Sequence, residues 1–194
     1  MRDNAFYRIA NRLFNLLFQK KLKKACAYFG KNARIDNPEV ISERHLLSIG
    51  DNTTILSHSR LQCYSALVTE TPHIKIGNNC YIGYYLTILA GADVIIDDWV
   101  LIASNVLISS ENHGMDPESE TPYMDQTLTC APVHIEEGCW ISEKVSILPG
   151  VTIGKKSIIG AGSVVTKSIP AYSIAVGNPA RVIKKYNFLT HGWE

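Results

Sequence analysis

The chain has 194 residues, of which 46% are hydrophobic and 19% charged, and its formal net charge is +1. This length fits one domain with a continuous core, and the composition excludes a disordered, collagen-like or membrane-spanning chain. The five cysteines (Cys26, Cys63, Cys80, Cys130 and Cys139) form no CxxC pair. We therefore expect reduced structural thiols in a cytoplasmic protein that has no signal peptide.

The N-terminal segment, residues 1–34, differs from the rest in charge and periodicity. It contains nine Lys or Arg and one acidic residue, whereas the remainder of the chain contains ten Lys or Arg and 17 acidic residues. Its apolar spacing predicts an amphipathic helical cap. One interpretation is that the helix covers the open end of a repetitive fold; the other is contact with an anionic membrane surface. The apolar residues are Phe6, Ile9, Leu13, Leu16, Leu17 and Phe18, and Lys20, Lys21, Lys23 and Lys24 follow.

From Ile135 to Val165 an aliphatic residue occupies every sixth position. An α-helix repeats every 3.6 residues and a strand every two, so neither element gives this period alone. A period of six arises when a short strand and a turn are repeated three times per circuit. The pattern therefore predicts an all-β solenoid of about six triangular coils over residues 35–185. The predicted triplets are Ile35/Ile41/Leu47, Ile49/Ile55/Leu61, Ile76/Ile82/Ile88, Ile96/Ile102/Ile108, Ile135/Ile141/Ile147 and Ile153/Ile159/Val165.

Two loops interrupt this phase, a modest one around residues 68–73 and a long one over residues 109–132. A loop as long as the second is uncommon in a compact domain unless it is functional. After Val165 the phase ends and a short basic tail begins, which could be helical after Pro179; residues 186–194 form its end.

His113 is the leading candidate for catalysis, because it lies in the long loop beside Gly114 and away from the aliphatic positions. A neutral imidazole can accept a proton at cytosolic pH. The other histidines (His45, His58, His73, His134 and His191) fit surface or structural roles better. The sequence shows no close pair of His or Cys ligands, which argues against a zinc site, and the acidic body argues against nucleic-acid binding.

Residues 76–185 resemble the hexapeptide-repeat acyltransferases, closest to the maltose/galactoside, xenobiotic and capsule or O-antigen O-acetyltransferases. The resemblance rests on Ile147–Gly154, Ile159–Lys167 and Gly177–Arg181 as a set. It implies a left-handed parallel β-helix, a homotrimer with active sites between subunits, and acetyl-CoA as co-substrate. His113 matches the family's general base, which takes a proton from an acceptor hydroxyl.

The resemblance also implies the residues on each side of the site. Those that match the acetyl-CoA groove are Trp140, Ser142, Glu143, Gly160, Ala161, Thr166, Lys167, Arg181 and Lys184. Two departures affect the match. Gly83-Tyr84-Tyr85 replaces an asparagine that often holds the acceptor, and Glu143 stands where a serine is common. The acceptor candidates are therefore Tyr84, Tyr85, Asn105, Asn112 and Asp116.

We expect an O-acetyltransferase that acts on a sugar hydroxyl in surface polysaccharide or glycoconjugate biosynthesis. Three alternatives stay open: N-acetylation of an amino sugar or nucleotide-sugar, a non-catalytic trimeric scaffold, and the zinc hydratase that the histidine pattern disfavours. Peripheral membrane contact through the N-terminal helix, at the inner face of the membrane, also stays open.

Overall fold

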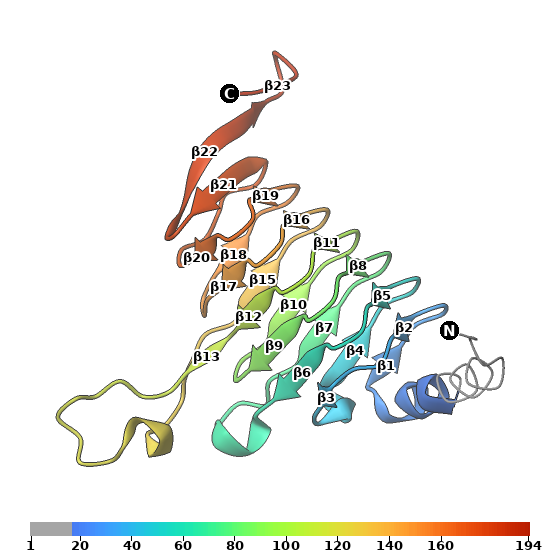
Figure 1. Ribbon diagram of the computed structural model, residues 1–194, viewed down its shortest axis with the longest axis vertical. Coiled ribbons are helices and arrows are strands. Elements are labelled where there is room, and N and C mark those ends of the chain that lie inside the picture. The colour runs from blue at the N-terminus through green and yellow to red at the C-terminus, as the bar shows by residue number, and fades with distance from the viewer. Residues whose placement is uncertain (1–16) are drawn as a thin grey trace, which may run out of the picture.

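The computed structural model describes residues 17–194, which form a prism of stacked triangular coils (Figure 1). Each coil contributes one short strand to each of three parallel sheets, and the coils wind into a left-handed β-helix, as expected. Sheet 1 contains β1 (Tyr28–Phe29), β4 (Leu47–Ile49), β7 (Ile74–Ile76), β10 (Val94–Ile96), β15 (Val133–Ile135) and β18 (Thr152–Ile153).

The other two faces of the prism are sheets 2 and 3. Sheet 2 contains β2 (Arg34–Ile35), β5 (Thr54–Ile55), β8 (Tyr81–Ile82), β11 (Leu101–Ile102), β16 (Trp140–Ile141) and β19 (Ile158–Ile159), extended by β21 (Ser173–Gly177), β22 (Ala180–Asn187) and β23 (Gly192–Trp193). Sheet 3 contains β3 (Val40–Ile41), β6 (Arg60–Cys63), β9 (Thr87–Ala90), β12 (Leu107–Ser109), β17 (Ser146–Ile147) and β20 (Val164–Val165).

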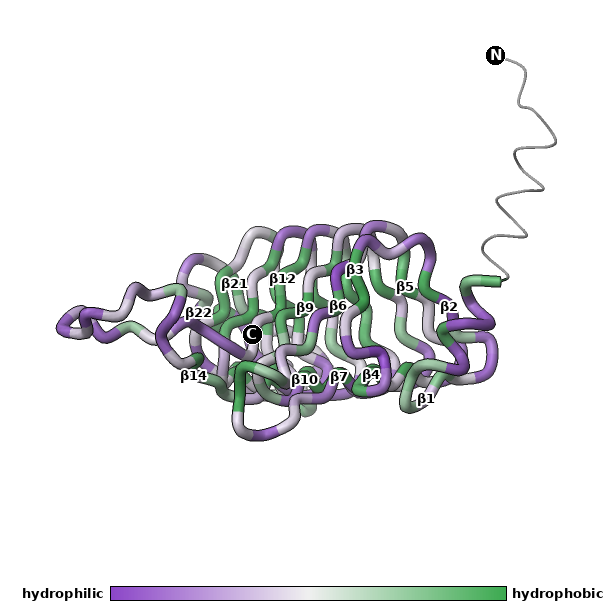
Figure 2. The backbone as a smooth tube through the Cα atoms, turned by 90° about the horizontal axis from the view of Figure 1, so that it is seen from below, coloured by the Kyte–Doolittle hydropathy of each residue, from purple (hydrophilic) through white to green (hydrophobic). Residues whose placement is uncertain are grey.

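The core explains the period of six. Ile82, Ile102 and Ile141 occupy equivalent places in successive coils, are in register with one another and are fully buried. Full burial of such a side chain contributes about 1.5–3 kcal/mol. Figure 2 shows apolar residues recurring along the strands, with hydrophilic residues concentrated at the turns.

The six predicted coils are confirmed, but the first triplet was wrong. The first coil contains Phe29, Ile35 and Ile41, because β1 pairs with β4 inside the segment assigned to the helical cap. Leu47 is not a third corner of that coil. It lies two residues before Ile49 in β4, and both side chains are buried because a three-residue strand turns both ends inward.

Residues 17–25 are helical and cover the first coil. Leu22 is fully buried and Phe18 packs against the core, whereas Leu17, predicted on the apolar face, is 60% exposed. Gln19 completes the cap: its Nε2 donates to Ile35 O at 2.6 Å, and Ile35 N donates to its Oε1 at 3.3 Å. Phe6, Ile9, Leu13 and Leu16 lie outside the described residues.

The tail differs from the prediction. Residues after Pro179 form strand β22, not a helix, and β22 pairs antiparallel with β21 and then with β23. The aromatic rings of Tyr172, Tyr186, Phe188 and Trp193 make edge-to-face contacts along this hairpin. Antiparallel pairing with β21, rather than any local period, therefore ends the solenoid.

All three excursions from the prism leave from one edge, where each strand of sheet 3 connects to the next strand of sheet 1; we call it edge 3–1. The first contains the 3-10 turn η1 (Arg44–Leu46). The second, residues 64–73, contains the 3-10 turn η2 (Ser65–Leu67) and is called the η2 loop. The third is the long loop, which is a hairpin: β13 (Glu111–Asn112) pairs antiparallel with β14 (Thr129–Cys130), and η3 (Tyr123–Asp125) lies between them. We call residues 109–132 the arm (Figure 1).

Candidate active site

The arm holds His113 directly after β13. Asn112 pairs with Thr129 and Glu111 with Cys130, so a two-stranded ladder supports the backbone just before the histidine. His113 is exposed, whereas the adjacent Gly114 is buried. The arm therefore presents the imidazole to the surroundings from a fixed base.

The base of the arm is fixed by Ser110, a fully buried serine. Its Oγ donates to Ala92 O at 2.7 Å and accepts from Ala92 N at 3.1 Å, which ties the arm to the turn after β9. Gly91 lets the two segments approach closely, because a Cβ there would lie 2.6 Å from Cys130 Sγ and 2.7 Å from Glu111 Cβ. Because this buried hydroxyl both donates and accepts a hydrogen bond, moving the base of the arm away from Ala92 would leave buried polar groups without partners.

The far part of the arm is organised by Gln126. Its Oε1 accepts from Asp116 N at 3.0 Å, and its Nε2 donates to Asp116 O at 3.0 Å and to Thr121 O at 2.9 Å. Gly114 packs beneath it, since a Cβ at Gly114 would lie 2.6 Å from Gln126 Cβ. One side chain thus holds the turn that begins at His113. Asp116, predicted to contact the acceptor, uses its Oδ1 to accept from Glu118 N at 2.9 Å.

A second group of predicted residues lies on the edge where sheet 2 turns into sheet 3, called edge 2–3. Tyr84 N donates to Ser104 Oγ at 3.1 Å, and Ser104 N donates to Glu143 Oε2 at 3.0 Å. Glu143, expected at the acetyl-CoA groove, therefore also joins neighbouring turns. Tyr85 and Asn105 occupy left-handed positions in these turns, at φ 59° and 60°. Ser142, Gly160 and Ala161 follow β16 and β19 on the same edge.

Trp140 lies on the outer face of sheet 2 and is 47% exposed. It is in register with Leu101, which is in register with Tyr81, and all three side chains are exposed. These three residues form an apolar stripe along sheet 2. Sequence analysis singled out Trp140 alone, because the other two gain significance only through the register.

The predicted cations lie at the C-terminal end. Thr166 and Lys167 follow β20, on edge 3–1, whereas Arg181 and Lys184 belong to β22. Arg181 Nη1 donates to Ala180 O at 3.0 Å, and Lys184 Nζ donates to Trp193 O at 3.4 Å. Within one chain, the predicted site is thus divided among the arm, edge 2–3 and the end of the solenoid.

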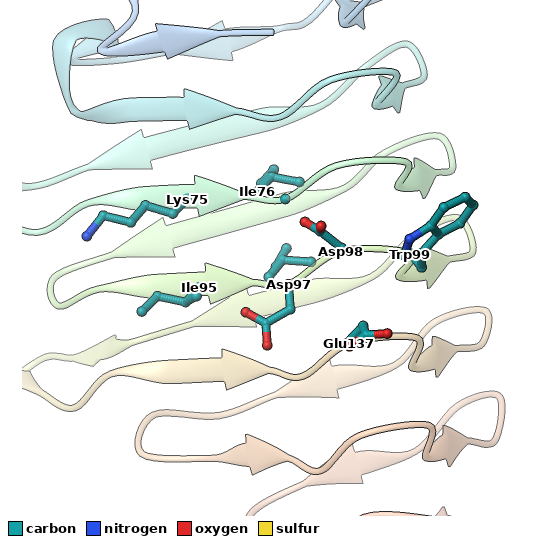
Figure 3. Close-up of a pocket in the computed structure, with 9 residues that line it drawn as sticks. Lys75, Ile76, Ile95, Asp97, Asp98, Trp99 and Glu137 are labelled. Carbon is teal, nitrogen blue, oxygen red and sulfur yellow. The ribbon is translucent and has the colours of Figure 1, made fainter.

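Two surface hollows contain none of the predicted site residues. One, of about 550 Å³, lies where sheet 1 turns into sheet 2 and is lined by Lys75, Asp97, Asp98, Trp99 and Glu137 among others (Figure 3). The other, of about 630 Å³, lies between the η2 loop and the base of the arm. It includes His73, whose Nδ1 lies 3.1 Å from Asp93 Oδ1. Sequence analysis treated His73 as one of the weaker histidines.

Over residues 17–194, no group of three or more His, Cys, Asp or Glu side chains is arranged to hold a metal ion. The same described part of the chain contains no helix long and apolar enough to cross a membrane. All five cysteines are free, and Cys130 is exposed in the arm, unlike the buried Cys63, Cys80 and Cys139.

Comparison with known proteins agrees with this architecture. Residues 132–167 match the family described as bacterial transferase hexapeptide (six repeats). The chain is 36% identical over 173 residues to the putative lipopolysaccharide biosynthesis O-acetyl transferase WbbJ of Escherichia coli K12, covering 86% of each chain. It is 44% identical over 115 residues to the galactoside O-acetyltransferase of E. coli K12; this match spans 59% of the chain but only 55% of that relative.

The fold is also similar to a hexapeptide-repeat acetyltransferase of Vibrio cholerae, solved in complex with acetyl-coenzyme A. The TM-score is 0.58 at 25% identity, covering 86% of this chain and 74% of that one. The repeated hexapeptides of the prism are the feature that the matched family of bacterial transferases describes. The extensive match to WbbJ then shows that this chain belongs to the bacterial hexapeptide-repeat transferase family.

Proposed function

We propose that the protein is an acetyl-CoA-dependent O-acetyltransferase that acts on a sugar hydroxyl, with His113 as general base. The observation that carries the proposal is the position of His113: exposed, on an arm fixed at its base and far end, in a chain of this family. The relatives named as O-acetyltransferases support a hydroxyl acceptor, and the acetyl-coenzyme A complex of the Vibrio cholerae protein supports the donor.

The mechanism follows from the properties of the imidazole. His113 accepts the proton of the acceptor hydroxyl as its oxygen attacks the acetyl carbonyl, and coenzyme A leaves as the thiol after the tetrahedral intermediate collapses. No acetyl-enzyme is needed, so catalysis depends on positioning of the two substrates and on N–H donors to the oxyanion. Ser110 and Gln126 supply the positioning of the base, because they hold the arm on either side of it.

A homotrimer would bring the divided parts of the site together. The stripe of Tyr81, Leu101 and Trp140 is an apolar surface suited to contact with a second copy. Packing of one copy's arm against another's edge 2–3 would bring His113 close to Tyr84, Glu143 and Ala161. In this arrangement, Thr166, Lys167, Arg181 and Lys184 supply hydroxyl and cationic groups for the coenzyme phosphates.

The proposed setting is surface polysaccharide or glycoconjugate biosynthesis at the cytoplasmic face of a membrane. The similarity to WbbJ, named as a lipopolysaccharide biosynthesis O-acetyl transferase, supports the polysaccharide part of this proposal. Lys20, Lys21, Lys23 and Lys24 are all exposed on the capping helix, which supports contact with anionic lipid. Flotation with vesicles of anionic and of neutral lipid tests this point. Equal flotation with both would leave only the capping role.

The central test replaces His113 with alanine and follows thiol release from acetyl-CoA with sugar acceptors. We expect turnover to fall by about 10²–10⁴-fold while acetyl-CoA binding, measured by calorimetry, is retained. His134→Ala is the matched control, because it removes a histidine outside the arm. Normal turnover by His113→Ala would refute the assignment, and preferential use of amine acceptors would favour N-acetylation instead.

A further inference from the structure

The last nine residues of the chain have no role in the proposed reaction. Residues 186–194 form the end of β22, a turn and β23, and we call them the tip. Figure 1 shows the tip beyond the last coil, at the opposite end of the molecule from the capping helix, with the arm directed away from it. The tip is therefore the outermost part of the described chain at the end of the solenoid.

The apex of the tip is apolar and exposed. Phe188 is 59% exposed and Leu189 92% exposed. The Phe188 ring makes edge-to-face contacts with Tyr172 and Tyr186, at 4.9 and 5.1 Å between ring centroids. Tyr186 in turn contacts the ring of Trp193 at 5.3 Å. The apex is therefore an apolar projection that a group of aromatic rings supports from behind.

A polar network fixes the shape of this apex. Asn187 Oδ1 accepts from Leu189 N at 2.8 Å and from Thr190 N at 3.4 Å. Asn187 Nδ2 donates to both carboxylate oxygens of Glu194, at 3.1 and 3.0 Å, and Thr190 Oγ1 donates to Glu194 Oε1 at 2.7 Å. A backbone N–H group that already has a partner is less costly to remove from water. The network thus prepares the apex for apolar surroundings.

Positive charge lies behind the apex. Arg181, Lys184 and Lys185 are all exposed on β22, and Glu194 is the one acidic residue over residues 180–194. The backbone of Glu194 pairs with that of Lys185, so the acidic residue belongs to the base of the tip. Lys185 precedes Phe188 by three residues, which is roughly 10 Å at a rise of about 3.4 Å per strand residue.

This order of groups matches the layers of a lipid surface. Apolar side chains of interfacial segments insert about 5–10 Å, aromatic rings lie at the interface, and cations meet the lipid phosphates. From the apex inwards, the tip presents Phe188 and Leu189, then Tyr186 and Trp193, and then Lys185. The apolar groups therefore lie deepest and the cation at head-group level.

Charge also favours this end of the molecule over the other. The arm contains five acidic residues and no Lys or Arg, and it is directed towards the end that the capping helix occupies (Figure 1). An anionic bilayer at that end would attract the lysines of the capping helix but repel the arm. A bilayer at the tip meets cations, with the arm turned away. The acidic residues of the arm are Glu111, Asp116, Glu118, Glu120 and Asp125.

We propose that the tip docks the protein on an anionic lipid surface, where Phe188 and Leu189 insert between the lipids and Lys185 contacts the head-group phosphates. The inference rests on the membrane setting proposed above, and it assigns the lipid contact to the tip and not to the capping helix. It does not depend on the acetyl-transfer reaction.

The first test is flotation of the full-length protein with vesicles of phosphatidylcholine alone and of equal parts phosphatidylcholine and phosphatidylglycerol. Leu189→Asp should raise the concentration of mixed lipid needed for half-maximal flotation about tenfold or more, because a carboxylate replaces the inserting group. Leu189→Trp should retain flotation, since an indole is favourable at the interface. Leu17→Asp is the matched control: Leu17 is a 60% exposed leucine on the capping helix, and its variant should float as the unaltered protein does.

The second test addresses the cation. Lys185→Ala should raise the required concentration of mixed lipid about fivefold, the scale of one lysine near an anionic surface. Lys21→Ala removes an exposed lysine from the capping helix and should have no effect. Neither tip variant should alter turnover with soluble sugar acceptors, because neither residue belongs to the proposed site.

The outcomes separate this inference from the proposed reaction. Loss of flotation in Leu17→Asp or Lys21→Ala, with the tip variants unaffected, would assign the contact to the capping helix and overturn the inference. It would also fail if Leu189→Asp changed the oligomeric state in sedimentation without lipid and left flotation intact, because the tip would then dock on a second copy. Acetyl transfer without any flotation would leave the reaction and overturn the tip. Flotation through the tip without transfer to any hydroxyl would do the reverse.

Discussion

Edges 2–3 and 3–1 of the same prism have different characters. Edge 2–3 repeats one short turn from coil to coil, with a left-handed residue in each, including Tyr85, Asn105, Lys144 and Gly162. Edge 3–1 contains η1, the η2 loop and the arm. The repeat therefore supplies a rigid body, and irregularity gathered at one edge supplies the hollow and the proposed base. Because each coil contacts only its neighbours, an insertion at one corner leaves the rest of the repeat intact.

The largest effect on stability is expected in the regular part. Ile102→Ala removes a fully buried side chain between Ile82 and Ile141 and should lower the free energy of unfolding by about 2–5 kcal/mol. Ile183→Ala, at an exposed position of β22, is the control and should change it by less than about 0.5 kcal/mol. Urea denaturation measures both. If both variants lowered the free energy of unfolding equally, burial within the coils would not be the main source of stability.

Thiol reactivity should also distinguish the two regions. Burial raises the pKa of Cys139 to about 11 and, with help from Glu43 and Asp93, that of Cys63 to about 12, so both stay protonated at pH 8. Partial burial and then Glu111 raise the pKa of Cys130 as well, but its side chain is exposed. Iodoacetamide at pH 8 should label Cys130 first, with the buried pair about 100-fold slower until urea is added. Peptide mass spectrometry resolves the sites, and rapid native labelling of Cys139 would mean that its coil opens.

A smaller effect is expected at the far part of the arm. Gln126→Leu removes the three hydrogen bonds to Asp116 and Thr121 and should reduce turnover about tenfold with little change in the unfolding temperature. Thr121→Ala is the matched control, since Thr121 contributes only its backbone oxygen to this contact. Steady-state kinetics and thermal unfolding give the comparison. If Gln126→Leu lowers the unfolding temperature as clearly as it lowers turnover, Gln126 stabilises the whole fold and not only the arm.

The smallest effect concerns Trp99, which is 61% exposed and has φ 61°, where earlier coils have Asn52 and Asn79. A left-handed backbone is costly for a bulky residue and tolerated by asparagine. Trp99→Asn should therefore raise the free energy of unfolding by about 0.5–1 kcal/mol, and Asn52→Trp should lower it similarly. If Trp99→Asn instead destabilises the assembly, the indole is covered by another chain.

The fold was predictable because the coils impose their period on the sequence. The error at Leu47 arose from that same period: Leu47 lies six residues after Ile41 and is buried, yet it shares β4 with Ile49. Strand β22 was not predictable, because its hydrogen bonds across the sheet come from β21 and β23, and local spacing reveals neither partner.

The site was partly predictable. His113 was singled out because it lies in a long loop that interrupts the six-residue repeat. His73 was not, because the η2 loop separates it from the preceding coil and obscures its position in that repeat. His73 precedes Ile74 as Asp93 precedes Val94, and these two strands are in register. Alignment of the coils on Ile74 and Val94 would have placed the histidine beside its carboxylate. Sequence alone gives neither the hollow nor the contact between Gly91 and the arm, since both depend on where separate excursions lie in space.

Gln19 has a consequence for solubility. A parallel β-helix ends in open strands, and an open strand can recruit another chain to continue the ladder. By occupying both backbone groups of Ile35, the Gln19 amide takes the place of a further peptide unit. The capping helix thus acts as a stop for end-to-end growth, so that a fold built by stacking remains a discrete particle and does not become a fibre.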